Sequence, residues 1–146
     1  MSRLEQPRAT GTDAPRASGA RSPLFSALVG LVGVGVLLQG VWAGLFIREG
    51  QDNSDVWVEV HARGAEITIL VALLAAVVAL VRLRSRPVLV VGSLALLVLL
   101  VAESYIGGLV GDQQVLEVVH FPLAMALLGL AVYLPVAAAR PRQPRR

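Results

Sequence analysis

Cysteine is absent from this chain of 146 residues, and histidine occurs only twice, as His61 and His120. The lack of cysteine excludes disulfides and thiolate metal sites. With only two imidazoles, a metal site built from three histidines is excluded as well. Lysine is also absent, so every basic residue is an arginine. Any group that is held by imidazole nitrogen must therefore use His61, His120 or both.

Charged residues are scarce, at 16% of the chain, whereas hydrophobic residues make up 55% and the mean hydropathy is +0.70. Such a composition is typical of a membrane protein. The net charge of +3 and the high isoelectric point would also suit a nucleic-acid-binding protein. However, the arginines lie in clusters that flank apolar runs, with no aromatic residues between them. We therefore exclude nucleic acid as a partner and expect the lipid bilayer instead.

Four long apolar segments predict an all-α, antiparallel bundle of four transmembrane helices over residues 24–139. The predicted helices cover residues 24–47, 57–83, 87–108 and 115–139. Residues 1–23 are rich in Pro, Ser, Thr, Gly, Ala and Arg, and we expect them to form a disordered cytoplasmic tail rather than a signal peptide. Residues 140–146 form a second, basic cytoplasmic tail.

The arginines predict the orientation of these helices. Eleven of the 13 lie in the N-terminal tail, in the turn between the second and third segments, or in the C-terminal tail. Arg48 and Arg63 are the two on the opposite side, among several acidic residues. Because arginine-rich loops stay in the cytoplasm, we expect both termini there, in a multi-pass protein of the cell (plasma) membrane.

The second segment carries ionisable residues to membrane depth. Its apolar part, residues 67–81, has 15 residues, and as a helix it covers about 22 Å of a hydrocarbon core that is about 30 Å thick. Glu66, Arg63 and His61 are therefore expected at or inside the outer membrane edge, where ionisable side chains are costly and often functional. Small residues recur along one side of the same helix, which predicts either a close-packing seam or a flat wall for a planar cofactor.

His61 and His120 are expected to lie at one depth on diagonally opposed helices. His61 precedes Arg82 by 21 residues and His120 precedes Arg140 by 20, so both lie about 30 Å from the cytoplasmic boundary. In an up-down bundle the second and fourth helices are diagonal, roughly 13 Å apart. Two imidazoles that reach inward across this distance would bind one haem iron as axial ligands. The alternative is that each imidazole simply lies at the membrane interface, half solvated.

Five further residues are candidates for support of such a site. Glu117 lies three residues before the second histidine and is predicted to accept a hydrogen bond from its imidazole. Arg48 and Arg63 would bind the haem propionates or else pair with the acidic loop. Glu66 and Glu103 lie deeper in the membrane, and several roles are open to them. They would share a proton, bind a water or pair with Arg63, or else form hydrogen bonds between helices as protonated acids.

One histidine stands at the outer start of the second segment and one at that of the fourth, the latter within VHFPLAMALLGLAVYL. This pattern resembles one four-helix half of haem A synthase. The resemblance covers residues 24–139 and rests on His61, His120 and Ala124. It implies that the two histidines bind haem between the second and fourth helices. The family's cysteine pair is missing, and its glutamate one turn before the first histidine has only Glu59 nearby, so we expect haem binding without synthase activity. The chain also resembles small four-span actinobacterial membrane proteins.

We therefore predict a small integral membrane protein that binds one haem b between His61 and His120, for electron transfer or haem handling. Its partners would be lipid and a redox partner or quinone, and no catalytic residue is predicted. The alternative is a non-catalytic four-span membrane protein with a structural or partner-binding role and no cofactor. A small multidrug-type exporter is disfavoured, because residues 24–47 contain no membrane-embedded carboxylate.

Overall fold

The computed structural model describes residues 22–47, 54–110 and 112–141, and it consists of helices joined by short turns. The α-helices are α1 (Pro23–Phe46), α2 (Ser54–Arg82), α3 (Pro87–Val110) and α4 (Glu117–Ala139). A single 3₁₀ turn, η1 (Gln114–Leu116), leads into α4. The prediction of an all-α four-helix bundle is confirmed, and each helix boundary lies within three residues of the predicted one. Arg48 and most of both predicted tails lie outside the described residues.

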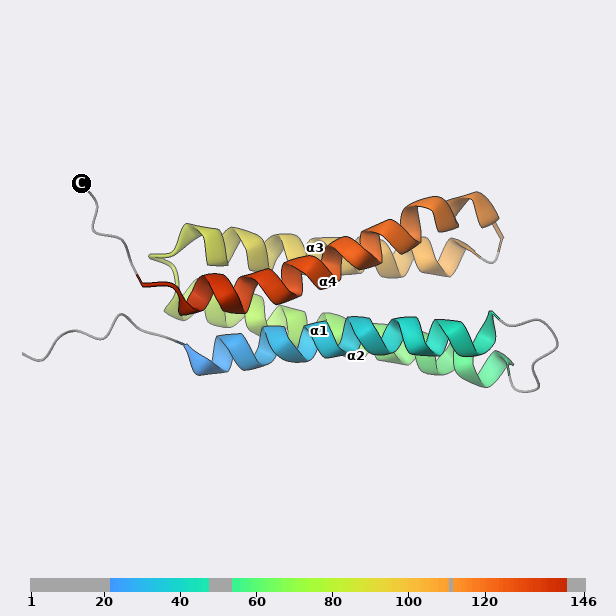
Figure 1. Cartoon of the computed structure of the whole chain (residues 1–146), viewed down its shortest axis with the longest axis horizontal. Coiled ribbons are helices and arrows are strands. Elements are labelled where there is room, and N and C mark those ends of the chain that lie inside the picture. The colour runs from blue at the N-terminus through green and yellow to red at the C-terminus, as the bar shows by residue number, and fades with distance from the viewer. Residues whose placement is uncertain (1–21, 48–53, 111, 142–146) are drawn as a thin grey trace, which may run out of the picture.

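The four helices form an antiparallel square. α1 packs against α2 and α4, and α3 packs against the same two helices, so that α2 and α4 are diagonal to each other. The first residues of α1 and the last residues of α4 lie at one end of the bundle, together with the turn between α2 and α3 (Figure 1). Toward the other end, the α1–α2 pair and the α3–α4 pair diverge. The histidines lie in that diverging half, near the starts of α2 and α4.

The outside of the bundle is apolar. All four helices are long and apolar enough to cross a membrane, yet a third or less of the residues in each apolar window are buried within the chain. Leucine and valine side chains cover the outer faces, for example Leu70, Val91 and Val98. A bundle in water would show polar residues on those faces. The chain is therefore a small, multi-pass integral membrane protein whose outer faces contact lipid.

The packing of the core decides between the two interpretations of the small residues along the second helix, a close-packing seam or a flat wall for a planar cofactor. Large apolar side chains of α1, α3 and α4, such as Phe25, Leu96 and Leu134, are buried in one cluster with the small side chains of α2. The buried positions of α2 are Gly64, Thr68, Ala72, Ala75, Ala76 and Ala79. Since Ala72 to Ala79 are covered by neighbouring helices, this stretch is a close-packing seam. It does not form a wall against a planar cofactor.

An arginine clamp closes the end of the bundle where α1 begins and α4 ends. The Arg86 guanidinium, in the turn before α3, donates hydrogen bonds to the carbonyl oxygens of Ala137 and Ala138, each at 2.7 Å, and of Arg140 at 3.2 Å. The last carbonyls of an α-helix have no partner within the helix. A cation is also favoured there by the helix dipole. Arg86 thus ties the C-terminus of α4 to the α2–α3 turn.

Replacement of Arg86 by alanine should lower the stability of the bundle by about 1–3 kcal/mol, because it removes charged hydrogen bonds to several carbonyls. Arg84 is the matched control, since it lies in the same turn, is exposed and makes no hydrogen bond with the described residues. Arg84→Ala should change stability by less than about 0.5 kcal/mol. Unfolding in detergent, followed by circular dichroism, measures both. Equal effects of the two substitutions would show that the clamp contributes nothing.

Candidate functional site

His61 is held between α2 and α1. Its Nδ1 lies 3.1 Å from the backbone carbonyl oxygen of Gln39, to which it donates when Nδ1 carries the proton. The ring of Phe46 stands edge-on to the imidazole, with centroids 5.4 Å apart. In the amide orientation that satisfies both of its ends, the Gln39 side chain donates to Nδ1 of His61 at 2.8 Å, when that nitrogen is unprotonated, and to the carbonyl of His61 at 2.9 Å, and it accepts from the backbone N–H of Ala65 at 2.8 Å. α1 therefore fixes both the backbone and the ring of His61.

His120 is held between α4 and α3. Its Nδ1 lies 3.0 Å from Oε1 of Glu103, and the two side chains are only 16% and 10% exposed. Gly107 follows Glu103 by one helical turn and lies under the imidazole, since a Cβ added there would approach Cε1 of His120 to 2.8 Å. The ring of Phe121 is tilted against the other side, with centroids 5.8 Å apart. α3 thus supplies a carboxylate and a flat, glycine-sized space to the second histidine.

The contact between Glu103 and His120 leaves polar atoms without hydrogen bonds. In the described part of the chain, neither carboxylate oxygen of Glu103 nor Nδ1 of His120 has a partner with hydrogen-bond geometry. The 3.0 Å approach is therefore an electrostatic contact whose angle is not that of a formed hydrogen bond. Buried polar groups in such a state are rare and call for an explanation. A small rotation of the imidazole, or a further group in the site, would satisfy them.

The two histidines lie at nearly the same depth. A Cβ added to Gly35 would touch Thr68, and one added to Gly33 would lie 3.6 Å from Cβ of Ala131. These two contacts give a common reference for depth, because each joins α1 to one of the helices that carry a histidine. Counted from Thr68 to His61 and from Ala131 to His120, and corrected for the spacing of Gly33 and Gly35, the depths of the two histidines differ by two residues, or about 3 Å along the bundle. The imidazoles are also close enough for the charge of one to act on the other. α2 and α4 thus hold the two histidines at a similar depth, toward the end of the bundle away from the two termini.

The other predicted site residues have different surroundings. Arg48 lies outside the described residues. Arg63 is exposed and pairs with Glu59 and Glu66 of its own helix. It is two residues from His61, so it projects from the other side of α2. Glu117 is exposed at the first turn of α4, and no hydrogen bond or ion pair joins it to His120 among the described residues. The carboxylate beside His120 is that of Glu103.

The sequence contained a signal for Glu103, although its partner could not be derived. Glu103 is the only charged residue of α3. A lone carboxylate within an apolar span needs a partner at its own depth. Three glycines follow it at 107, 108 and 111. The rotation of α3 about its axis decides which neighbouring helix Glu103 and Gly107 face. The sequence specifies this rotation only weakly, because both the lipid-facing and the protein-facing sides of a transmembrane helix are apolar.

Two imidazoles alone are fewer ligands than a zinc site in a protein uses. Within the described residues, no group of three or more His, Cys, Asp and Glu side chains is placed to hold a metal ion. A zinc ion needs at least three protein ligands. A haem brings four nitrogen ligands of its own and needs only axial ligands from the protein. Two imidazoles meet that need.

Comparisons with family models, with curated proteins and with solved structures found no match for this chain. The resemblance to haem A synthase therefore stays a prediction from three residues, and the site is interpreted from its own geometry.

Proposed function

We propose that this integral membrane protein binds one haem b between His61 and His120, near the outer ends of α2 and α4, and uses it in electron transfer or haem handling. One observation carries the proposal. In each imidazole Nδ1 lies near an oxygen that can accept its proton, at 3.1 Å from the Gln39 carbonyl for His61 and at 3.0 Å from the Glu103 carboxylate for His120, where a small rotation of the ring is needed to form the hydrogen bond. Histidines that bind a metal usually donate their second N–H to a carbonyl or carboxylate in this way, which fixes the tautomer and the ring orientation.

The opposite nitrogen of each ring remains for the iron. No hydrogen bond to Nε2 of His61 or His120 is made by any described residue. With Nδ1 protonated, Nε2 carries the lone pair that binds metal, and for His61 this tautomer requires that the Gln39 side-chain amide does not donate to Nδ1. Haem b needs no covalent attachment, so the absence of cysteine is compatible with it. The bound group would supply one-electron chemistry. The chain's own residues would orient both rings, exclude water and place the group near the outer face.

The remaining parts of the proposal follow from the position of the site. A redox partner or quinone would exchange electrons at the outer side, close to the divergent ends of the helix pairs (Figure 1). The arginine distribution supports the assignment of that side to the outside of the cell membrane. Arg63 is already engaged by Glu59 and Glu66. Arg48, the other outer cation proposed from the sequence as a partner for a haem propionate, lies outside the described residues.

The direct test is the absorption spectrum of the full chain, purified from haem-replete cells in mild detergent. We expect a Soret band, a sharp α band upon reduction, and a haem-to-chain ratio near one. A colourless protein from these cells would overturn the proposal. The cofactor-free alternative would then apply, in which the contact between Glu103 and His120 serves only to join α3 to α4.

Gly107 and Gly108 offer a matched pair of substitutions in this site. Gly107→Ala would place a Cβ 2.8 Å from Cε1 of His120, so the imidazole must move. Gly108→Ala meets nothing within 4 Å. We expect several-fold weaker haem binding for Gly107→Ala and unchanged binding for Gly108→Ala, measured by titration of the apoprotein. If both variants bind haem as the parent does, His120 is not a ligand in the orientation described here.

A further inference from the structure

An ionic triad lies on the outer face of α2, away from the histidines. It consists of Glu59, Arg63 and Glu66, whose side chains are between 63% and 66% exposed. Exposed apolar residues continue the same face toward the cytoplasm, among them Leu70 and Leu74. The buried side of α2 carries Gly64, Thr68 and the alanine seam instead. The triad therefore faces the surroundings of the bundle and not its core.

The depth of this triad is unusual for exposed charge. Thr68 packs opposite Gly35, which is near the middle of the 24-residue helix α1. Glu66 lies two residues and Arg63 five residues outward from Thr68, or about 3 and 8 Å along the axis. With the bundle centred in the bilayer, the hydrocarbon core extends about 15 Å to either side. Both residues then lie at hydrocarbon depth, where ionisable side chains nearly always face protein or water.

The triad is only partly satisfied by its own members. Arg63 donates from Nε to Oε1 of Glu59 at 2.8 Å, and from Nη1 to Oε2 of Glu66 at 3.1 Å. Within the described residues, Nη2 of Arg63 donates to nothing, and each glutamate keeps one oxygen that accepts nothing. The face thus offers both unused donors and unused acceptors. A second copy of the same face supplies what each lacks, and this self-complementarity is the signature of a two-fold interface.

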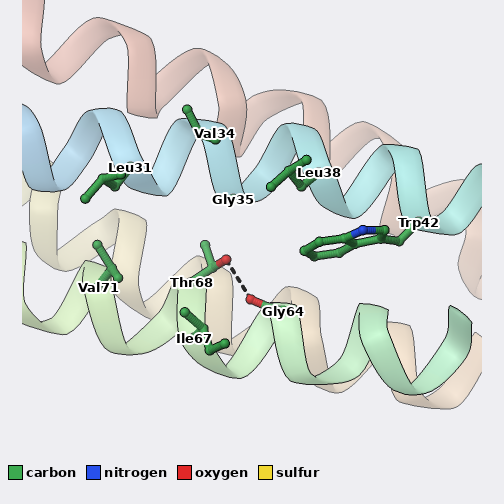
Figure 2. Close-up of a pocket in the computed structure, with 9 residues that line it drawn as sticks. All are labelled: Leu31, Val34, Gly35, Leu38, Trp42, Gly64, Ile67, Thr68 and Val71. Carbon is green, nitrogen blue, oxygen red and sulfur yellow. Dashed lines mark hydrogen bonds between the residues drawn. The ribbon is translucent and has the colours of Figure 1, made fainter. Parts of the chain in front are cut away.

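An apolar groove borders the triad. It has a volume of about 240 Å³ and lies between α1 and α2 (Figure 2). Leu31, Leu38 and Trp42 line it from α1, and Ile67 and Val71 from α2. Thr68 supplies the one side-chain hydroxyl group in the groove. This hydroxyl already donates to the carbonyl of Gly64 at 2.7 Å. Apart from the indole N–H of Trp42 the lining is apolar, so the groove accepts apolar side chains from a neighbouring helix.

We infer that two copies of the chain associate in the membrane through α2, around a two-fold axis along the membrane normal. The two α2 helices then run parallel, with Leu70 near the axis. Arg63 of each copy reaches Glu59 or Glu66 of the other, which are offset from it by about 6 and 5 Å along the helix. Apolar side chains beside the axis enter the groove of the opposite copy. This inference does not depend on haem binding, because α2 presents the triad and His61 on different sides.

The absence of cysteine makes a clean test possible. We expect Leu70→Cys, oxidised in native membranes, to give a covalent dimer of the chain. Val98→Cys on α3 is the matched control, since Leu70 is 56% and Val98 is 65% exposed. The cross-linked fraction should be several-fold higher at position 70. Equal fractions at both positions, no dimer at position 70, or a cross-link at position 70 to a different protein would each overturn the inference.

A second variant tests the role of charge. Arg63→Gln in the Leu70→Cys background keeps the length and a hydrogen-bonding amide but removes the cation. Because Arg63 is exposed, the fold of the single chain should be retained, which helix content by circular dichroism checks. We expect a several-fold lower cross-linked fraction. An unchanged fraction would mean that the ionic triad does not join the copies and would refute the interface as described.

Discussion

Replacement of either His61 or His120 by alanine is expected to abolish the spectrum of a haem with two axial imidazoles. Under the proposed function each histidine supplies one axial ligand, and the sequence contains no third histidine to replace either of them. The iron would keep at most one protein ligand, so the Soret band should shift and weaken, and the sharp reduced α band should disappear. The haem-to-chain ratio of the purified variants should fall several-fold.

A loss of haem must be separated from a loss of fold. Added imidazole provides the control, because it can enter the space left by the alanine and bind the iron in place of the missing side chain. Restoration of the parent spectrum by imidazole would show that the ligand, and not the bundle, was lost. If either variant keeps the full parent spectrum without imidazole, the proposed pair of ligands is incorrect.

Glu103→Gln should weaken haem binding far more than Glu117→Gln. Glu103 is the buried carboxylate at 3.0 Å from Nδ1 of His120, whereas Glu117 is exposed at the start of α4. Loss of a carboxylate that orients a metal-binding histidine typically costs about 10–100-fold in affinity. Glutamine keeps the shape and an acceptor oxygen but removes the charge. We expect a weaker affinity in that range, and a changed midpoint potential, for Glu103→Gln alone.

The measurements are haem titration of the apoprotein and a redox titration of the loaded protein. Glu117→Gln is the control for removal of a carboxylate near the same helix, and it should change stability by only about 0.3–1 kcal/mol through the helix dipole. The reverse result, with Glu117→Gln the damaging substitution, would restore the support predicted from the spacing of Glu117 and His120. Two variants with parent affinity and potential would remove both carboxylates from the site.

The arrangement of the helices could be predicted because lipid imposes it. A span needs about 20 apolar residues, so the apolar runs determine where the helices lie. The depth of His61 and His120 followed from their distances to Arg82 and Arg140, because both arginines mark the same boundary and helical rise is constant. Short connections between antiparallel helices make α2 and α4 diagonal, which the packing pattern of the structure bears out.

The support of His120 could not be predicted, because it depends on a contact between helices. The spacing of Glu117 and His120 shows that both project from one side of α4, but it does not show what the neighbouring helix brings there. In the structure, α3 brings Glu103 and Gly107 to that ring. The carbonyl partner of His61 was equally hidden, since every residue has a backbone carbonyl and the sequence does not mark the one at Gln39.

The unequal construction of the two ends of the bundle sets an order of events during biogenesis. The buried apolar cluster and the Arg86 clamp lie in the middle of the bundle and at the end where α4 stops, while the helix pairs diverge toward the other end (Figure 1). Under the proposed function we therefore expect the chain to insert and fold first and haem to be loaded afterwards, at the end where the helix pairs diverge. Haem-starved cells would accumulate folded apoprotein, which takes up colour when haem is supplied after protein synthesis has been stopped.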